Sequence, residues 1–258
     1  MEISYLNIIT FITFLLTTLF YYFALKPVLP YTLYKNTEEY NSYITSSYMY
    51  LVIYVLLIIL TQSAINSYII TNKCGGTITE NIGKASMITI LPWIFIFGFL
   101  VVILTVYPGF KSAFSDIVGY YYVSSSANKV FTELLMNKEV VDELTNHPDV
   151  TSDKNKALKS ASNVINRICS NTCVLINQMA PSNFDQYWDI LAPLMKKKYQ
   201  IDSPETDYMQ NELFGLIMTK DNIGEAMWYI YTGLLVTLIV QSKIMNRDCK
   251  KNGKESKE

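Results

Sequence analysis

The chain has 258 residues and a net charge of −1, and 50% of its residues are hydrophobic while only 17% are charged. This balance excludes nucleic-acid binding driven by an overall positive charge, because such binding depends on Lys and Arg neutralising phosphates. The apolar residues gather in long charge-free runs, whereas a water-soluble helix carries them on one face. The composition therefore predicts an integral membrane protein.

Four apolar runs reach or approach the roughly 20 helical residues that a bilayer core about 30 Å thick requires. They predict transmembrane helices at about 4–25, 48–70, 86–107 and 226–245. The first run begins with Met1-Glu2 and lacks a small-residue cleavage site, so we expect an anchor and not a cleaved signal peptide. The predicted fold is all-α, with a small helical extramembrane domain at 108–225 between the third and fourth transmembrane helices.

The fourth span is followed by a basic tail at 246–258, which we expect to be disordered. From Lys243 onward the sequence holds six Lys or Arg residues against three acidic residues. Because Lys and Arg concentrate on the cytoplasmic side of membrane spans, the tail predicts cytosolic N- and C-termini and a 108–225 domain on the opposite side. Glu2 before the first span and Lys26 after it favour the reverse orientation.

The second span turns polar toward its end. Gln62 and Asn66 are four residues apart in the second span and share one helix face. In a bilayer such side chains hydrogen-bond to neighbouring helices, so we expect interhelical contacts here, with a permeation path as the alternative. The centres of the spans carry none of the ionisable groups on which pumps and voltage sensors depend. Pro92 and Gly98 predict a kink in the third span.

The segment after the third span has an aromatic pattern. Pro108-Gly109 ends the span, and bulky residues then recur at helical spacing at Phe110, Phe114, Ile117, Val118, Tyr121 and Tyr122. We expect a juxtamembrane amphipathic helix with its aromatic side chains inserted in the bilayer surface, or the same face packed beneath the domain. Further on, Ser203-Pro204 predicts a helix start, and Asp221 predicts the start of a separate helix that runs into the fourth span.

The four cysteines do not predict a metal site. Cys169 and Cys173 are one turn apart, but His147 is the only histidine, so a zinc site lacks its other ligands. The pair is expected to fill a buried helix face or to form a disulfide. Cys74 and Cys249 are expected in the cytosol, and Cys249, beside a span and in a basic tail, is a palmitoylation candidate.

No catalytic signature stands out, and we expect neither an enzyme nor a cofactor. Asp185 and Asp189 are one turn apart and could serve acid–base chemistry on a lipid. Acidic residues also favour helix starts without any catalytic role. The Lys196–Lys198 run lies near a predicted helix C-terminus, where the helix dipole favours cations, and a contact with lipid headgroups is the alternative.

Two stretches resemble a known family of viral proteins. PGFKSAFSDIVGYYYV after the third span and KDNIGEAMWYIYTGLLVT at the start of the fourth are similar to elements of a multi-spanning membrane protein family of nucleocytoplasmic large DNA viruses of algae and protists. The segment LINQMAPSNFDQYWDILAPLM, which lies between them, contains an Asn-Phe pair typical of that family. Phe110 stands at a position where the family has Trp. The resemblance covers about residues 100–240. It implies a protein of the lipid layer under a viral capsid, with no established catalytic activity.

The main hypothesis is therefore a structural or assembly component of a viral internal membrane, either in the virion or derived from host endoplasmic reticulum. Its partners would be the lipid bilayer and capsid, core or other viral membrane proteins, and an oligomer is compatible with this role. The candidate contact residues are Phe110, Phe114, Tyr120, Tyr121, Tyr122, Lys196, Lys197 and Lys198. A channel or transporter, and a viral fusion factor, are the alternatives.

Overall fold

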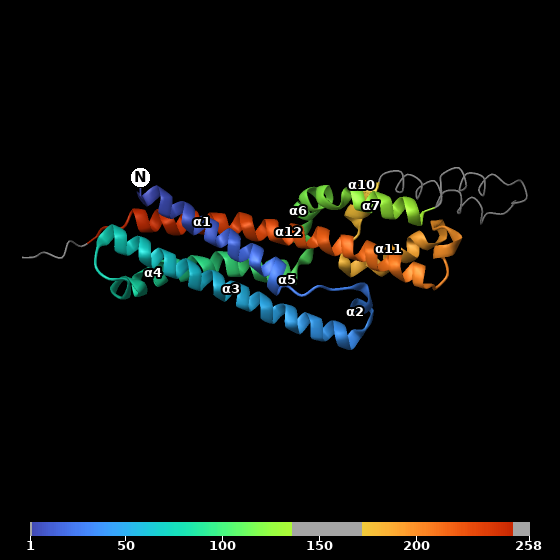
Figure 1. Cartoon of the computed structure of the whole chain (residues 1–258), viewed down its shortest axis with the longest axis horizontal. Coiled ribbons are helices and arrows are strands. Elements are labelled where there is room, and N and C mark those ends of the chain that lie inside the picture. Colours follow the sequence, from blue (N-terminus) through green and yellow to red (C-terminus); the bar gives the residue numbers. More distant parts are fainter. Residues whose placement is uncertain (1, 136–171, 250–258) are drawn as a thin grey trace, which may run out of the picture. The chain divides into compact units, whose positions relative to one another are not determined.

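The computed structural model of the chain describes residues 2–135 and 172–249, and in these ranges the protein is built of helices without a β-strand (Figure 1). Four of the described helical segments are long and apolar enough to cross a membrane. They are Ile8–Leu25, Thr37–Cys74, Ile78–Val106 and Pro204–Met245. The predicted class, all-α with four transmembrane helices, is confirmed.

The helices that precede residue 108 include the first three candidate spans. They are α1 (Glu2–Phe20) with the π-helical turn η1 (Tyr21–Leu25), α2 (Tyr31–Lys35), α3 (Thr37–Cys74), α4 (Ile78–Pro92), the π-helical turn η2 (Trp93–Gly98) and α5 (Phe99–Val106). Because Pro92 has no backbone N–H, the regular α-helical hydrogen bonding ends there and continues in π-helical form. The backbone irregularity lies where Pro92 predicts a kink.

The helices after residue 107 are shorter, except for the last. They are η3 (Pro108–Lys111), α6 (Ser112–Phe114), the π-helical turn η4 (Ser115–Gly119), α7 (Tyr120–Leu134), α10 (Thr172–Gln178), η5 (Pro181–Asn183), α11 (Phe184–Leu191), η6 (Ala192–Leu194), η7 (Lys197–Tyr199) and α12 (Pro204–Met245). The predicted start of α12 is confirmed, since Ser203 Oγ accepts a hydrogen bond from the Thr206 backbone N–H at 3.2 Å. The separate helix predicted to begin at Asp221 is wrong, because α12 is one helix of 42 residues.

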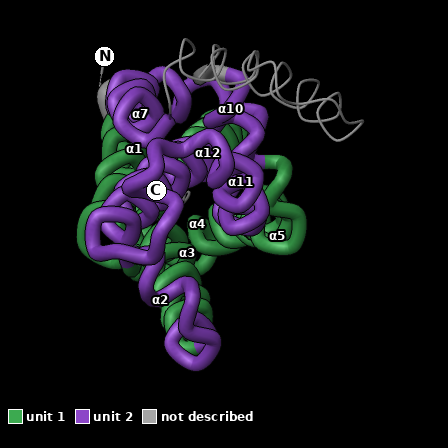
Figure 2. Tube along the Cα trace, turned by 90° about the vertical axis from the view of Figure 1, so that its right-hand side faces the viewer, with its two compact units in different colours: residues 1–27, 42–110, 226–258 green, residues 28–41, 111–225 purple. Residues whose placement is uncertain are grey.

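The chain forms two compact units, coloured separately in Figure 2. The membrane unit contains residues 1–27, 42–110 and 226–258, and the second unit contains 28–41 and 111–225. Both α3 and α12 contribute residues to each unit. The second unit thus includes a segment between the first two spans, in addition to the domain between the third and fourth.

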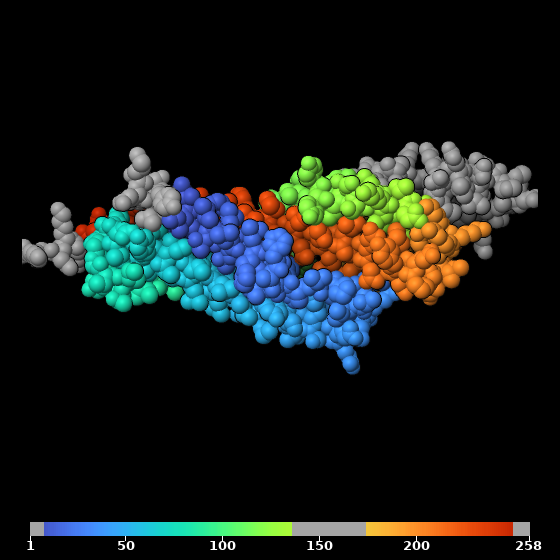
Figure 3. Space-filling view, in the orientation of Figure 1, coloured from blue at the N-terminus to red at the C-terminus, as the bar shows by residue number. Residues whose placement is uncertain are grey.

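Aromatic side chains fill the core of the membrane unit. Phe14 of α1 lies 5.3 Å from Trp93 between ring centroids, and Phe97 lies 5.5 Å from Tyr229 of α12. Tyr54 of α3 is fully buried among them. Figure 3 shows α1, in dark blue, alongside α3, in lighter blue. Many apolar side chains point outward instead, as a surface that faces lipid requires; they include Leu16, Leu60, Phe95 and Leu238.

The second unit has its own core, built around two aromatic residues of α11 and α12. Phe184 and Phe214 are fully buried, with ring centroids 5.2 Å apart. Tyr31 of α2 packs on both rings at 5.0 and 5.4 Å and is 4% exposed. The segment 28–41 therefore supplies part of the core of this unit and is not only a connection between spans.

Candidate functional site

The aromatic residues singled out after the third span are largely exposed. Tyr121 and Tyr122 of α7 are 84% and 72% exposed, and Phe110 is 56% exposed. Phe114 and Tyr120 are half-buried. Within the described residues, the exposure of Tyr121, Tyr122 and Phe110 favours a face that points outward over one packed beneath the domain. We call Tyr121 and Tyr122, with the 70% exposed Ile117, the aromatic face.

The opposite side of the same segment packs closely on α12. A Cβ atom added at Gly119 would lie 2.5 Å from the Lys220 carbonyl oxygen. One added at Gly224 of α12 would lie 2.6 Å from the Cβ of Ser115. Contacts this short leave no room for a side chain, so both positions require glycine. The two stretches that carry the family resemblance thus meet in the structure.

Charged residues surround this contact and pair across it. The Lys111 ammonium nitrogen lies 2.9 Å from a carboxylate oxygen of Asp221 and 2.8 Å from one of Glu225. The Lys220 ammonium lies 2.8 Å from a carboxylate oxygen of Asp116. We call these five residues the Lys111 cluster. Asp221, which the sequence suggested as a helix cap, is therefore a partner of Lys111 on the flank of α12.

The electrostatics of the cluster favour a fully charged lysine. The Lys111 side chain is only 14% exposed. Burial alone would lower the pKa of Lys111, but the carboxylates of Glu225 and Asp221 outweigh it and raise the pKa above its usual value. A lysine that stays protonated can act neither as a nucleophile nor as a base, so the arrangement is suited to holding η4 and α7 on α12.

The Lys196–Lys198 run is partly engaged within the second unit. The ammonium groups of Lys196 and Lys198 lie 3.4 and 2.8 Å from the carboxylate of Glu133, and the Tyr199 hydroxyl donates to the same group at 2.8 Å. The hydrogen bonds from Lys198 and Tyr199 lower the pKa of Glu133 to about 2. Of the three lysines proposed as contacts, Lys196 and Lys198 form ion pairs with Glu133 of α7. Lys197 is exposed.

Gln62 and Asn66 belong to a buried polar network that connects the helices of the membrane unit. Gln62 donates to the Thr10 carbonyl of α1 at 3.1 Å. Asn66 donates to the Thr89 hydroxyl of α4 at 2.9 Å and accepts from Gln241 of α12 at 2.8 Å. Asn66 and Gln62 are at most 1% exposed. The network thus bonds the second span to the other three and places these amides inside the bundle.

Asp185 is a partner of Tyr31, and Asp189 lies one turn further along α11. The Tyr31 hydroxyl donates to Asp185 Oδ1 at 2.7 Å. Burial, with help from the bond to Asp185, raises the pKa of Tyr31, so this hydroxyl stays a donor. Both carboxylates lie on the exposed side of α11. No three His, Cys, Asp or Glu residues gather as a possible metal site in the part of the chain that the structure describes.

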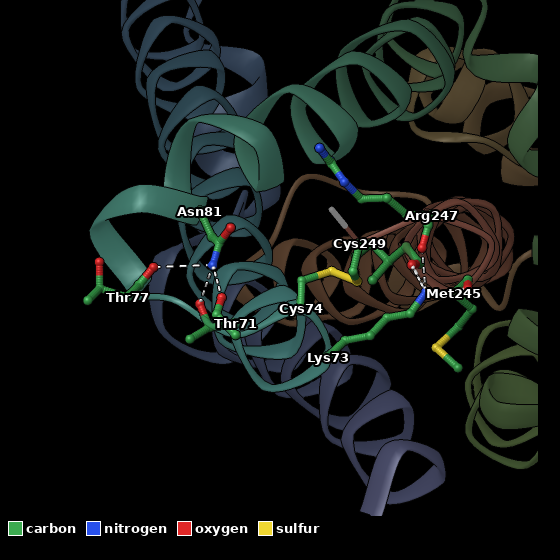
Figure 4. The surroundings of a disulfide bond; sticks show 10 residues. Thr71, Lys73, Cys74, Thr77, Asn81, Met245, Arg247 and Cys249 are labelled. Carbon is green, nitrogen blue, oxygen red and sulfur yellow. Dashed lines mark hydrogen bonds between the residues drawn. A yellow bond between two sulfur atoms is a disulfide. The ribbon is translucent and has the colours of Figure 1, made fainter. Parts of the chain in front are cut away.

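One end of the membrane unit is closed by a disulfide bond between Cys74, the last residue of α3, and Cys249 after α12 (Figure 4). The palmitoylation suggested for Cys249 is wrong for this state, because a thioester needs a free thiol. The beginning of the tail is also bonded to α3, although it was expected to be disordered. The expectation for Cys169 and Cys173 lies outside the described residues and side chains.

Lys73, next to the disulfide, holds the end of α12. Its ammonium donates to the backbone carbonyls of Ile244 at 3.0 Å and Arg247 at 2.9 Å, and also to that of Met245 (Figure 4). The last carbonyls of a helix have no partner within the helix, and a cation there is favoured by the helix dipole. Sequence reasoning missed both contacts. The available signal was that Cys74 and Cys249 follow spans that end on the same side of a membrane.

Comparison with known proteins gives no match: no family model, curated protein or solved structure is similar to the chain. The function must therefore be inferred from the residues of the chain itself. The aromatic face points outward, whereas the Lys111 cluster and the polar network act within their units.

Proposed function

We propose that the protein is a structural or assembly component of a viral internal membrane, anchored by its spans and binding a viral protein through its second unit. The aromatic face supports this role most directly. Tyr121 and Tyr122 are exposed, while the other side of their segment is fixed on α12 by the Lys111 cluster and Gly119. Tyrosine is enriched at protein interfaces, since it offers a large contact area and a hydroxyl group at a low cost in conformational entropy.

The interior of the membrane unit supports an anchor more than a channel. Gln62 and Asn66, the residues that a permeation path would use, are buried and bonded to neighbouring helices. Aromatic rings of Phe14, Trp93 and Phe97 fill the space between the helices. A bundle packed in this way is suited to holding a second unit at a bilayer.

The viral setting rests on the family resemblance. Lys111 of the first resembling stretch and Asp221 of the second are 110 residues apart in sequence, yet they form an ion pair. The first stretch also supplies Asp116 to the Lys111 cluster, and the second supplies Lys220 and Glu225. The resemblance therefore concerns one structural element and not two unrelated segments. We place the protein in the inner membrane of the virion or in a membrane derived from host endoplasmic reticulum.

The proposal is tested by site-specific photocrosslinking in purified virus particles. Benzoylphenylalanine replaces Tyr122 in one variant and Tyr208 in a matched control, since Tyr208 is a 65% exposed tyrosine of α12 in the same unit. We expect the protein to stay with particle membranes after alkaline stripping. We also expect Tyr122 to crosslink to a capsid, core or membrane protein at several times the yield of Tyr208.

Two results would contradict the proposal. The protein could be absent from particles although it is present in membranes of infected cells, or the Tyr122 variant could crosslink to lipid alone. The orientation of the spans is a separate question, because the basic tail and the Cys74–Cys249 disulfide favour opposite sides of the membrane.

A further inference from the structure

The disulfide and the Lys73 contact lie at the same place and reinforce each other. Cys74 and Cys249 are 175 residues apart in sequence, yet their Cα atoms are 5.0 Å apart, within the range of about 4.4–6.8 Å that disulfides require. Lys73, the residue before Cys74, donates to the carbonyl of Ile244 at the end of α12 and to that of Arg247 just after this helix. The segment after Met245 is thus held at the end of α3 by a hydrogen bond that does not depend on the disulfide (Figure 4).

We infer that this end of the membrane unit faces an oxidising compartment and that the second unit faces the cytosol. Disulfides persist in the lumen of the endoplasmic reticulum, outside the cell and at virion surfaces, whereas cytosolic thiols are kept reduced. In a membrane derived from host endoplasmic reticulum, the oxidising side is the lumen. Closing the bond removes two protons and two electrons from the Cys74 and Cys249 thiols. The electron acceptor is the disulfide of a thiol–disulfide oxidoreductase, which is the class of oxidant found in that lumen.

One bond is enough to orient all the extramembrane segments. Cys74 follows the second span and Cys249 the fourth, so both lie on the side of the N-terminus. Residues 28–41 follow the first span and residues 111–225 the third, so both parts of the second unit lie on the opposite side. The partner of the aromatic face is then a cytosolic protein or a protein domain exposed to the cytosol.

This orientation is the reverse of the one expected from the basic tail. Charges around the first span agree with it, since Glu2 precedes that span and Lys26 follows it. The first helix usually dominates the orientation of a multi-spanning protein.

Glycosylation in microsomes tests the inference on the full-length chain. The sequence contains no Asn-x-Ser/Thr acceptor, so any acceptor added is an unambiguous reporter of the lumenal side. One variant carries an acceptor tag appended after Glu258. The other is Ser124→Asn, which completes an Asn-Ser-Ser acceptor with the exposed Ser125 and Ser126 of α7.

We expect the tail tag to be glycosylated and the Ser124→Asn variant to stay unmodified. Mass spectrometry of the same microsomes should recover Cys74 and Cys249 as one linked peptide. Cys249→Ser with the tail tag is the control, and it should lose the linked peptide but keep its glycan, because insertion and not the disulfide sets the orientation.

The opposite pattern, with a glycan on Ser124→Asn and none on the tail tag, overturns the inference. Recovery of unlinked Cys74 and Cys249 peptides from the microsomes overturns it as well. Neither outcome decides the proposed function, since association with virus particles and crosslinking through Tyr122 can be measured whichever side the tail occupies.

Discussion

Lys111 is the residue whose loss should harm the second unit most. Its ammonium lies within 3 Å of two carboxylates, on Asp221 and Glu225, whose side chains are 19% and 10% exposed. Lys111→Met keeps most of the apolar stem but removes the ammonium that the two carboxylates share. Because an uncompensated buried charge costs about 3–5 kcal/mol, we expect the free energy of unfolding to fall by about 3 kcal/mol. Chemical unfolding in detergent micelles, followed by tryptophan fluorescence, measures this loss.

Lys129→Met is the matched control for this prediction. Lys129 is an exposed lysine of α7, so the substitution removes the same charge from the protein without uncovering a buried carboxylate. Exposed substitutions usually change stability by no more than about 0.5 kcal/mol. Equal losses in the two variants would show that net charge, and not the pairing of Lys111, determines the effect.

At the scale of elements, the contact between η4 and α12 depends on Gly224. A Cβ atom there would lie 2.6 Å from the Cβ of Ser115 and 2.8 Å from the Lys111 carbonyl oxygen. Backbone atoms cannot move away without disturbing η4, so we expect Gly224→Ala to destabilise the protein by about 1–3 kcal/mol. Gly215 of the same helix has nothing within 4 Å of an added Cβ.

Gly215→Ala is therefore expected to be neutral or to stabilise the protein by up to about 1 kcal/mol, because alanine is the better helix former. Each variant adds one methyl group to the same helix of the wild type. Unfolding in detergent micelles therefore compares the free energies of unfolding of the two variants directly. A change of the same sign and size in both would mean that η4 and α12 are not in close contact.

The connection between the end of α7 and the 196–199 segment should weaken in acid. Glu133 has a pKa of about 2 in the folded protein, below its ordinary value of 4.5, because Lys198 and Tyr199 donate hydrogen bonds to it. A carboxylate whose pKa is lower in the folded protein than in the unfolded chain stabilises the fold. This stabilisation is complete at a pH above the pKa of the unfolded chain, and it is lost as the pH falls towards the pKa of the folded protein. We expect this contribution to disappear between about pH 4.5 and 2.

The measurement is the thermal midpoint as a function of pH, for the wild type and for Glu133→Gln. Other carboxylates titrate in both proteins, so the difference between the two curves isolates Glu133. We expect the midpoints to lie apart at pH 6 and to converge as the pH falls towards 2. Curves that stay parallel over this range would rule out the predicted role of Glu133.

The elements that sequence reasoning found correctly depend on local physics. The spans follow from charge-free runs, because a hydrocarbon core tolerates little else, and the start of α12 follows from Ser203-Pro204. Asp221 shows where local reasoning fails. An acidic residue before an apolar run is typical of a helix start, but Lys111, 110 residues earlier, determines its role. The disulfide was missed for the same reason, since its cysteines are 175 residues apart.

At the scale of the whole molecule, the chain does not divide into one membrane segment and one domain. The second unit takes residues 28–41 from between the first two spans and 111–225 from between the last two. The sequence predicted only the second of these, because segment 28–41 is short and its helix, α2, has five residues. What recruits it to the unit is Tyr31, whose hydroxyl bonds Asp185 at a separation of 154 residues.

Substitution of Tyr31 should consequently disturb helices that lie far from it in the sequence. Tyr31→Ala empties a buried position against Phe184 and Phe214, and truncation of a buried aromatic residue costs about 3–5 kcal/mol. Tyr31→Phe keeps the ring and loses only the bond to Asp185, which is worth about 1–2 kcal/mol. We expect the α11 amides to exchange hydrogen fastest in Tyr31→Ala, more slowly in Tyr31→Phe and most slowly in the wild type.

Tyr208→Ala is the control, because Tyr208 is a 65% exposed tyrosine of the same unit, and exchange in α11 should match the wild type. If segment 28–41 were only a connection between spans, Tyr31→Ala would behave like Tyr208→Ala. The predicted difference instead requires that the loop after the first span be part of the second unit. That loop and residues 111–225 must then lie on the same side of the membrane. The experiment therefore also tests whether the chain crosses the membrane twice between them, through the second and third spans.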